Sequence, residues 1–220
     1  GRPHLMLTKS ETFVDAHGLS LLSLDDPNFK IAIYPALSAL KGNLPIKKAA
    51  PDGLFQVYEA AAKSRSIPVT LTKIRDARPV PPLAMTGPGG TAVEPAPEVF
   101  GRSAAWTIAI PAGALSGLDD AFLRIKARGD VARLFAGMKM IDDQFLNGST
   151  WDVGLKRFTG ELKSPLMFTV LPMRKDAAIY LDGGVASMVD GDQTAEVTDV
   201  SVAPQYRLNL TSAAPAHKKR

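Results

Sequence analysis

Short runs of alternating apolar and polar residues, each ended by a residue that breaks regular structure, constrain this chain most. Residues 29–34 alternate and stop at Pro35, and residues 106–110 alternate and stop at Pro111. A period of two is the pattern of a half-buried strand, and proline ends it because proline cannot donate to the hydrogen-bond ladder. Helical signal is limited to single turns. The sequence therefore predicts an all-β protein.

Many short strands separated by turn signals over 220 residues are typical of a sandwich or barrel. Residues 78–98 are rich in Pro and Gly and show no periodicity, so they predict a break in the chain. The expected regions are an N-terminal β-rich region (1–77), a Pro/Gly-rich linker or long loop (78–98), a jelly-roll-like β-sandwich (99–212) and a mobile basic tail (213–220). The first region is either a second, smaller β domain or part of the same sandwich.

Charge and composition exclude several function classes. The net charge is +4, but the basic residues do not cluster with aromatics, so no nucleic-acid partner is expected. No apolar run approaches the roughly 18 residues that would cross a bilayer, and no membrane partner is expected. The chain has no cysteine, which excludes disulfides, thiolate metal sites and cysteine nucleophiles.

Gly137-Met138, between two strand-like runs, predicts a two-residue type II′ hairpin turn, with Gly supplying the positive φ. Counting outward from this turn pairs Phe135 with Met140 and Arg133 with Asp142. We therefore predict a structural cross-strand ion pair between Arg133 and Asp142, a contribution of roughly 0.2–1 kcal/mol.

The same stretch carries an ordered set of motifs. They are Gly-Asp-Val-Ala-Arg-Leu at 129–134, Asp-Asp-Gln-Phe at 142–145, Asn-Gly at 147–148, Trp-Asp-Val-Gly-Leu at 151–155 and a strand-and-loop segment at 171–181. About 60 residues in this order resemble the C-terminal β-sandwich region of bacterial glycoside hydrolase family 35 β-galactosidases. One departure is the hairpin tip, where the family pattern usually has Asn-Gly.

The resemblance implies a galactose-binding-like jelly-roll fold and an origin in a β-galactosidase-type enzyme. The family's catalytic barrel has no counterpart here, so no catalytic residue can be carried over, and the chain alone is not expected to be an enzyme. We expect a fragment that packs on the catalytic domain of the same polypeptide, with galactosides as a second candidate partner. A periplasmic or secreted parent is favoured. The alternatives are a freestanding carbohydrate- or protein-binding module and an enzyme in its own right.

Sugar sites combine aromatic faces with Asp, Asn or Arg. The candidate carbohydrate-binding residues are Trp151, Asp143, Asn147 and Tyr180, although Trp151 also alternates with Val153 and Leu155 as a core residue would.

Catalytic and metal chemistry have weaker signals. Asp142 and Asp143 are strand neighbours that should point to opposite faces, whereas a glycosidase needs two facing carboxyls. The three histidines (His4, His17 and His217) lack zinc-site spacing. Residues 190–192 (Asp-Gly-Asp) place two carboxylates in a turn, but a structural Ca²⁺ would need further oxygen ligands. We therefore expect neither a metal site nor a cofactor.

Overall fold

The computed structural model describes residues 3–15, 18–87, 89–180 and 183–212. Half of the chain is in β-strands and 7% is in short helices, which confirms the all-β prediction. No helix in the described part of the chain is long and apolar enough to cross a membrane. His17, His217 and the predicted tail 213–220 lie outside the described residues.

The chain forms two compact units, each assembled from segments distant in the sequence. The first unit comprises residues 1–66, 115–121 and 203–220, and the second comprises residues 67–114 and 122–202. The division therefore does not fall at the predicted linker 78–98, which lies within the second unit. The physical reason is that β17 (Glu196–Ser212) is one 17-residue strand whose residues 205–212 pair with the N-terminal strands β3 and β5.

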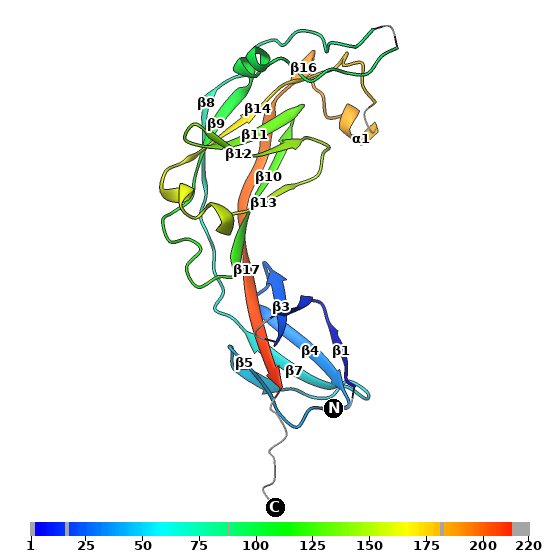
Figure 1. Cartoon of the computed structure of the whole chain (residues 1–220), viewed down its shortest axis with the longest axis vertical. Helices are drawn as coiled ribbons and strands as arrows, with labels where there is room; N and C mark the ends of the chain where they lie inside the picture. Colours follow the sequence, from blue (N-terminus) through cyan, green and yellow to red (C-terminus); the bar gives the residue numbers. More distant parts are fainter. Residues whose placement is uncertain (1–2, 16–17, 88, 181–182, 213–220) are drawn as a thin grey trace, which may run out of the picture. The chain divides into compact units, whose positions relative to one another are not determined.

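The first unit is built from antiparallel strands in two sheets (Figure 1). One sheet has the order β1-β4-β7-β6, and in the other β17 lies beside β3 and β3 beside β2, with β5 also paired to β17. The strands of this unit besides β17 are β1 (Leu5–Thr8), β2 (Glu11–Asp15), β3 (Gly18–Leu24), β4 (Asn28–Tyr34), β5 (Leu40–Gly42), β6 (Ile46–Lys48) and β7 (Gln56–Ala61).

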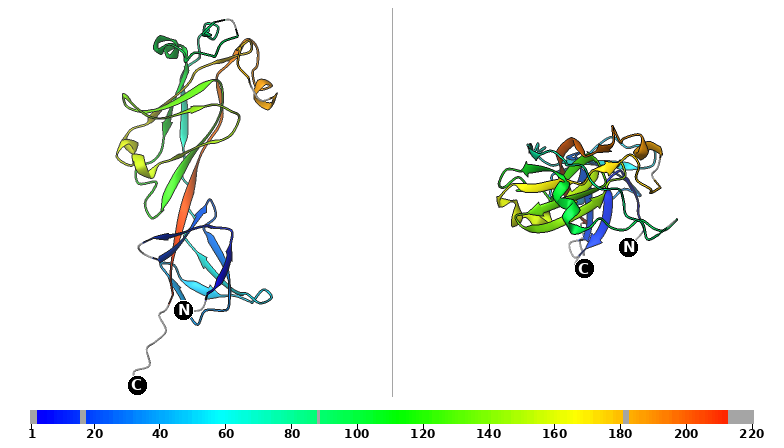
Figure 2. Two further views of the ribbon diagram at one scale, coloured as in Figure 1. Left: turned by 45° about the vertical axis from the view of Figure 1, so that its right-hand side comes forward. Right: turned by 90° about the horizontal axis from the view of Figure 1, so that it is seen from above.

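Alternate residues of β4 fill the interior of the first unit. Phe29, Ile31 and Ile33 are buried while Lys30 and Tyr34 are exposed, as the alternation predicts. They meet side chains of β3 and β17, and the strands curl around them (Figure 2). Burying each such side chain contributes roughly 1.5–3 kcal/mol, so this interior holds the unit together.

The second unit is a β-sandwich of a five-stranded sheet, in the order β12-β11-β14-β9-β8, and a sheet with the order β13-β10-β17. Its elements in chain order, before β17, are β8 (Thr70–Arg75), η1 (Pro97–Arg102), β9 (Ala104–Ala109), β10 (Asp120–Arg128), β11 (Val131–Ala136), β12 (Lys139–Phe145), β13 (Trp151–Gly154), η2 (Lys156–Phe158), η3 (Glu161–Lys163), β14 (Leu166–Val170), β15 (Met173–Arg174), α1 (Gly183–Ala186) and β16 (Gln193–Thr194). Here η marks a 3-10 helix.

Aromatic side chains join the two sheets of the second unit. Phe168 of β14 lies with its ring centroid 6.0 Å from Trp106 of β9 and 6.2 Å from Trp151 of β13. All three are buried, and Val153 continues the inward alternation of β13. Tilted rings at this spacing stabilise a core beyond their buried area. Trp106 and Trp151 are therefore core residues.

The β11–β12 hairpin has the predicted turn but not the predicted ion pair. Gly137 has φ +59°, and Met138 is not among the described residues with positive φ, as a type II′ turn requires. Phe135 pairs with Met140 as predicted, but Arg133 pairs with Asp143 and not with Asp142. The register shifts next to Leu134 because Ile141 is inserted as a β-bulge, which moves every later pair by one residue. The predicted Arg133–Asp142 pairing is therefore wrong.

Candidate functional site

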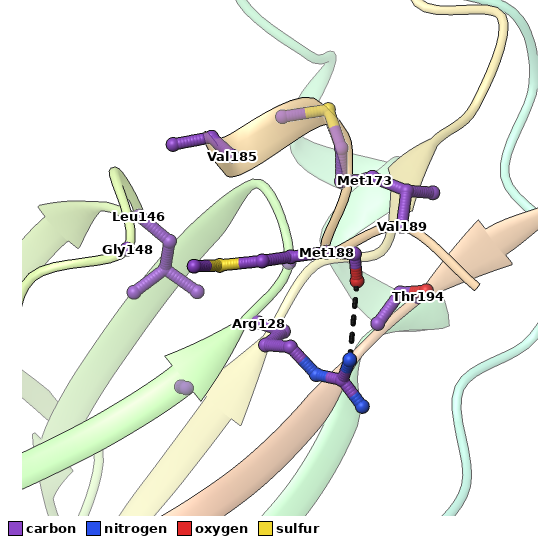
Figure 3. A pocket seen from close by; sticks show the side chains of 10 residues that line it. Arg128, Leu146, Gly148, Met173, Val185, Met188, Val189 and Thr194 are labelled. Atoms are coloured by element: carbon purple, nitrogen blue, oxygen red, sulfur yellow. Dashed lines mark hydrogen bonds between the residues drawn. The ribbon is translucent and has the colours of Figure 1, made fainter. Parts of the chain in front are cut away.

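Two hollows of different size lie in the second unit. The smaller, shown in Figure 3, has a volume of about 10 Å³, room for about one water molecule. Arg128 crosses its floor and donates to the Met188 carbonyl at 3.4 Å and to Asp190 at 3.0 Å, and it also pairs with Glu196. This hollow is a packing crevice whose sides are linked by Arg128. The Asp190 carboxylate is one of the partners of Arg128.

The larger hollow has a volume of about 420 Å³, within the usual range of small-molecule sites. One wall is the Pro-rich stretch that the sequence predicts as a linker, and the other is the segment after β14. We call it the proline cavity. It is lined by Val80, Pro81, Pro82, Leu83, Ala84, Val93, Glu94, Pro95, Ala96, Glu98, Val99, Asp130, Leu171, Pro172, Met173, Arg174, Ala177 and Ile179.

Side-chain donors hold the Pro-rich wall in place. Proline has no N–H, so a proline-rich segment cannot be fixed by a regular ladder, but its carbonyls still need donors. Arg102 donates to the Pro79 carbonyl at 2.7 Å, and Arg174 donates to the Val80 carbonyl at 3.0 Å. Gln193 donates to the Arg78 carbonyl at 3.1 Å and accepts from the Val80 N–H at 3.0 Å. The segment is therefore fastened onto the sandwich.

Beneath this wall lies a small apolar cluster. Val80, Val131 and Leu171 are buried together, with the partly buried Val99 and Phe100 against them. Two of these residues also belong to the resembling motifs, at 129–134 and 171–181. The apolar floor of the cavity is thus continuous with the motif strands.

Asp130 is the most distinctive polar residue of the cavity. Its backbone is fixed from both sides, because its N–H donates to the Leu171 carbonyl at 2.8 Å and its carbonyl accepts from the Leu146 N–H at 2.9 Å. Its carboxyl has no hydrogen bond or ion pair with any described residue. Burial alone raises the pKa of Asp130, because the charged form loses water without gaining a partner.

The other charges of the cavity are arranged differently. The Arg174 guanidinium binds both carboxylate oxygens of Asp176, at 2.7 and 2.6 Å, and this partner raises the pKa of Arg174. Glu94 and Glu98 are exposed at the mouth. Glu94 lies 3.9 Å from Arg133, whose guanidinium stacks 3.2 Å from the centroid of the Phe100 ring. The positive charges therefore already have partners, whereas Asp130 does not.

The four predicted carbohydrate-binding residues lie on different strands and loops of the second unit. Trp151 is 7% exposed and packs in the core, so its face is not available to a sugar. Asp143 is exposed on β12, and Asn147 accepts from the Ser149 N–H at 3.0 Å in the following turn. Tyr180 is 95% exposed in the loop after β15. None of the four lines the proline cavity or the small crevice.

Asp142 and Asp143 also have separate environments. Asp142 forms an ion pair with Arg157, and Asp143 lies on the exposed side of the strand. Neither lines the cavity, where the carboxyls are Glu94, Glu98 and Asp130. In the described part of the chain, no group of three or more His, Asp or Glu side chains is placed to hold a metal ion. Chemically, the cavity combines an apolar surface with one half-buried carboxyl that has no described partner.

Sequence reasoning missed this cavity because its walls are about 80 residues apart and one of them has no periodicity. A signal was present: the Pro-rich stretch contains Val80, Leu83 and Val93, apolar residues that a solvated linker does not need.

Comparisons with known proteins add no relative. No protein-family model matches the chain, and neither a curated protein nor a solved structure shows significant similarity to it.

Proposed function

We propose that this chain is a non-catalytic, ancillary β-sandwich part of a β-galactosidase-like glycoside hydrolase, and that it packs on the catalytic domain of the same polypeptide. The observation that carries the proposal is the role of the motif residues. Leu134 and Leu155 are fully buried, and a Cβ at Gly129 would lie 2.3 Å from Val170 Cγ1. Many residues that carry the resemblance therefore build the fold, whereas Asp130 and part of the segment 171–181 line the proline cavity.

The carboxyl groups support a non-catalytic role. Glycoside hydrolysis uses two carboxyls about 5–9.5 Å apart on either side of a sugar. Asp142 forms an ion pair with Arg157, and no aromatic side chain among the described residues lines the cavity that holds Asp130 to support a sugar ring. We expect the chain not to hydrolyse nitrophenyl galactosides. Turnover that Asp130→Asn or Glu94→Gln abolishes would contradict this.

An exposed apolar face of the first unit supports packing. On β1, Met6 packs against the core, whereas Leu5 and Leu7 face outward at 56% and 51% exposure. Leu5 pairs with Tyr34 of β4, which is 45% exposed and has its ring centroid 6.1 Å from Phe55. A contiguous apolar group of this kind marks an interaction surface more often than a scattered residue does. We assign it to the catalytic domain.

The decisive observation is the reading frame that encodes the chain. It should also encode a catalytic barrel, and a frame that encodes this chain alone would overturn the proposal. In the full-length protein, Leu7→Lys should lower the midpoint of thermal unfolding more than Val14→Lys, a matched change at an isolated exposed residue on β2. Equal effects of the two substitutions would show that this face is not the contact.

A freestanding binding module is the second candidate, and the proline cavity favours it. Titration of the chain with galactose tests whether such a module binds carbohydrate. Saturable binding that Tyr180→Ala removes would replace the packing-only account by a sugar-binding one.

A further inference from the structure

We propose that the proline cavity is a binding site for an aliphatic primary ammonium group, held at Asp130. The inference does not rest on the proposed function, because it uses only residues of the second unit. A failure of either leaves the other standing, since one is tested by small-molecule titration and the other by the reading frame and the outer face of β1.

The residues that line the cavity indicate which apolar part of a ligand fits it. Its carbon surface comes from aliphatic side chains and four prolines, and no described aromatic ring lines it. Sugar rings and nucleic-acid bases are held by stacking on aromatic rings, and quaternary ammonium ions by aromatic cages. A flexible aliphatic chain needs neither, because its burial requires only apolar area. The cavity therefore suits an alkyl chain better than a ring.

The charges select the head of the ligand. Three carboxyls (Glu94, Glu98 and Asp130) face one guanidinium in the lining, and that guanidinium is already bound to Asp176 and to the Val80 carbonyl. Glu94 is partly neutralised by Arg133, 3.9 Å away, so the excess negative charge of the lining lies at Asp130 and Glu98. Asp130 adds an acceptor with a fixed backbone and no partner, and a charged donor gains more from such a group than a neutral hydroxyl does.

Three ligands of one chain length test the idea on the full chain by calorimetry or NMR titration: hexylamine, 1-hexanol and hexanoate. Hexylammonium should bind saturably, with a dissociation constant on the order of 1 mM, as a ligand of so few atoms allows. It should bind at least about tenfold more tightly than hexanol, and hexanoate more weakly than both. Equal binding of hexanol, or no saturable binding of hexylammonium, overturns the proposal.

Variants locate the site. Asp130→Asn keeps the shape of the side chain and removes its charge, so hexylammonium affinity should fall about tenfold while hexanol affinity stays within about twofold. Asp143→Asn is the matched control, an exposed carboxylate of the same unit that does not line the cavity, and it should change neither affinity. Glu94→Gln should produce a smaller loss than Asp130→Asn, because Glu94 lies at the exposed mouth. If Asp143→Asn weakens hexylammonium binding as much as Asp130→Asn does, the ammonium group binds elsewhere and the assignment is overturned.

The source of the ammonium group is distinguished in the same titration. Nα-acetyl-lysine methylamide presents the group as a protein would, and hexylamine presents it as a free small molecule. Tighter binding of the lysine derivative assigns the cavity to a lysine side chain of a partner, and tighter binding of hexylamine assigns it to a small amine. If Asp130→Asn lowers neither affinity, the ammonium assignment fails for both sources.

Discussion

The two units differ in how completely their apolar side chains are packed. In the first, every second residue of β4 points inward and meets the side chains of β3 and β17, so the interior is filled. In the second, apolar residues of the stretch 80–99 lie on a segment whose described residues form no strand before η1, and space for a ligand remains beside them. In a regular strand, the alternation itself directs every second side chain into the core. A proline-rich segment must be fastened by side chains from elsewhere, and its apolar residues are left to line a cavity.

Large-to-small substitution should separate the two regions most strongly. Phe29→Ala removes a ring that is 1% exposed from the filled interior, and should lower the free energy of unfolding by about 3–5 kcal/mol. Val93→Ala, at a cavity-lining residue that is 41% exposed, should change it by less than about 0.5 kcal/mol. Urea denaturation of both variants measures the difference. Similar losses would show that the cavity wall is packed as tightly as the core.

The fastening of the proline-rich wall should give the next largest effect. Arg174→Ala removes the donor to the Val80 carbonyl and leaves Asp176 without its partner, so it should lower the free energy of unfolding more than Lys175→Ala does. Lys175→Ala, at the exposed neighbouring residue, is the control. Hydrogen exchange should accelerate at residues 80–99 in the Arg174 variant and remain slow in β4. Uniform acceleration over both regions would contradict a local fastening role.

Asp130 should make the cavity region sensitive to pH. Its carboxyl has a raised pKa in the folded protein, so the folded state binds more protons than the unfolded state between the ordinary pKa of 3.8 and the raised one. The stability of the wild type therefore falls as the pH rises through that window. Asp130→Asn should be more stable than the wild type at pH 7, and the gain should disappear below the ordinary pKa. A gain that persists at low pH would assign the effect to something other than ionisation.

The same contrast sets how much of the molecule could be predicted from sequence. The strand 29–34 follows from local periodicity and the Gly137-Met138 turn from its glycine, and both are as predicted, whereas Trp151, a candidate for sugar binding that also alternates as a core residue would, is buried in the core. The two-unit division could not be predicted, because residues 205–210 of β17 pair with residues 19–24, far away in the chain. The cavity could not be predicted either, because Arg174 and Gln193 reach a segment about 100 residues earlier.

The hairpin shows how one residue limits a register prediction. A turn fixes the first pairs, but a bulge inserts one residue, which shifts the inward and outward alternation of the strand and moves every later partner. Met140 therefore keeps its predicted partner and Asp142 does not. Nothing in residues 139–145 marks Ile141 as the inserted residue.

The smallest effect concerns the partner of Asp142. Double-mutant cycles with alanine should give a coupling free energy of about 0.2–1 kcal/mol for Asp142 with Arg157, the range of exposed ion pairs, because their side chains are 25% and 59% exposed. The cycle of Asp142 with Arg133 should give a coupling near zero, because the bulge places Arg133 opposite Asp143 and its guanidinium lies against Phe100 and Glu94. Urea denaturation of the single and double variants measures both couplings. A larger coupling free energy of Asp142 with Arg133 than with Arg157 would support the register without the bulge. Asp142 of β12 would then contact Arg133, whose guanidinium lies beside the wall of the proline cavity.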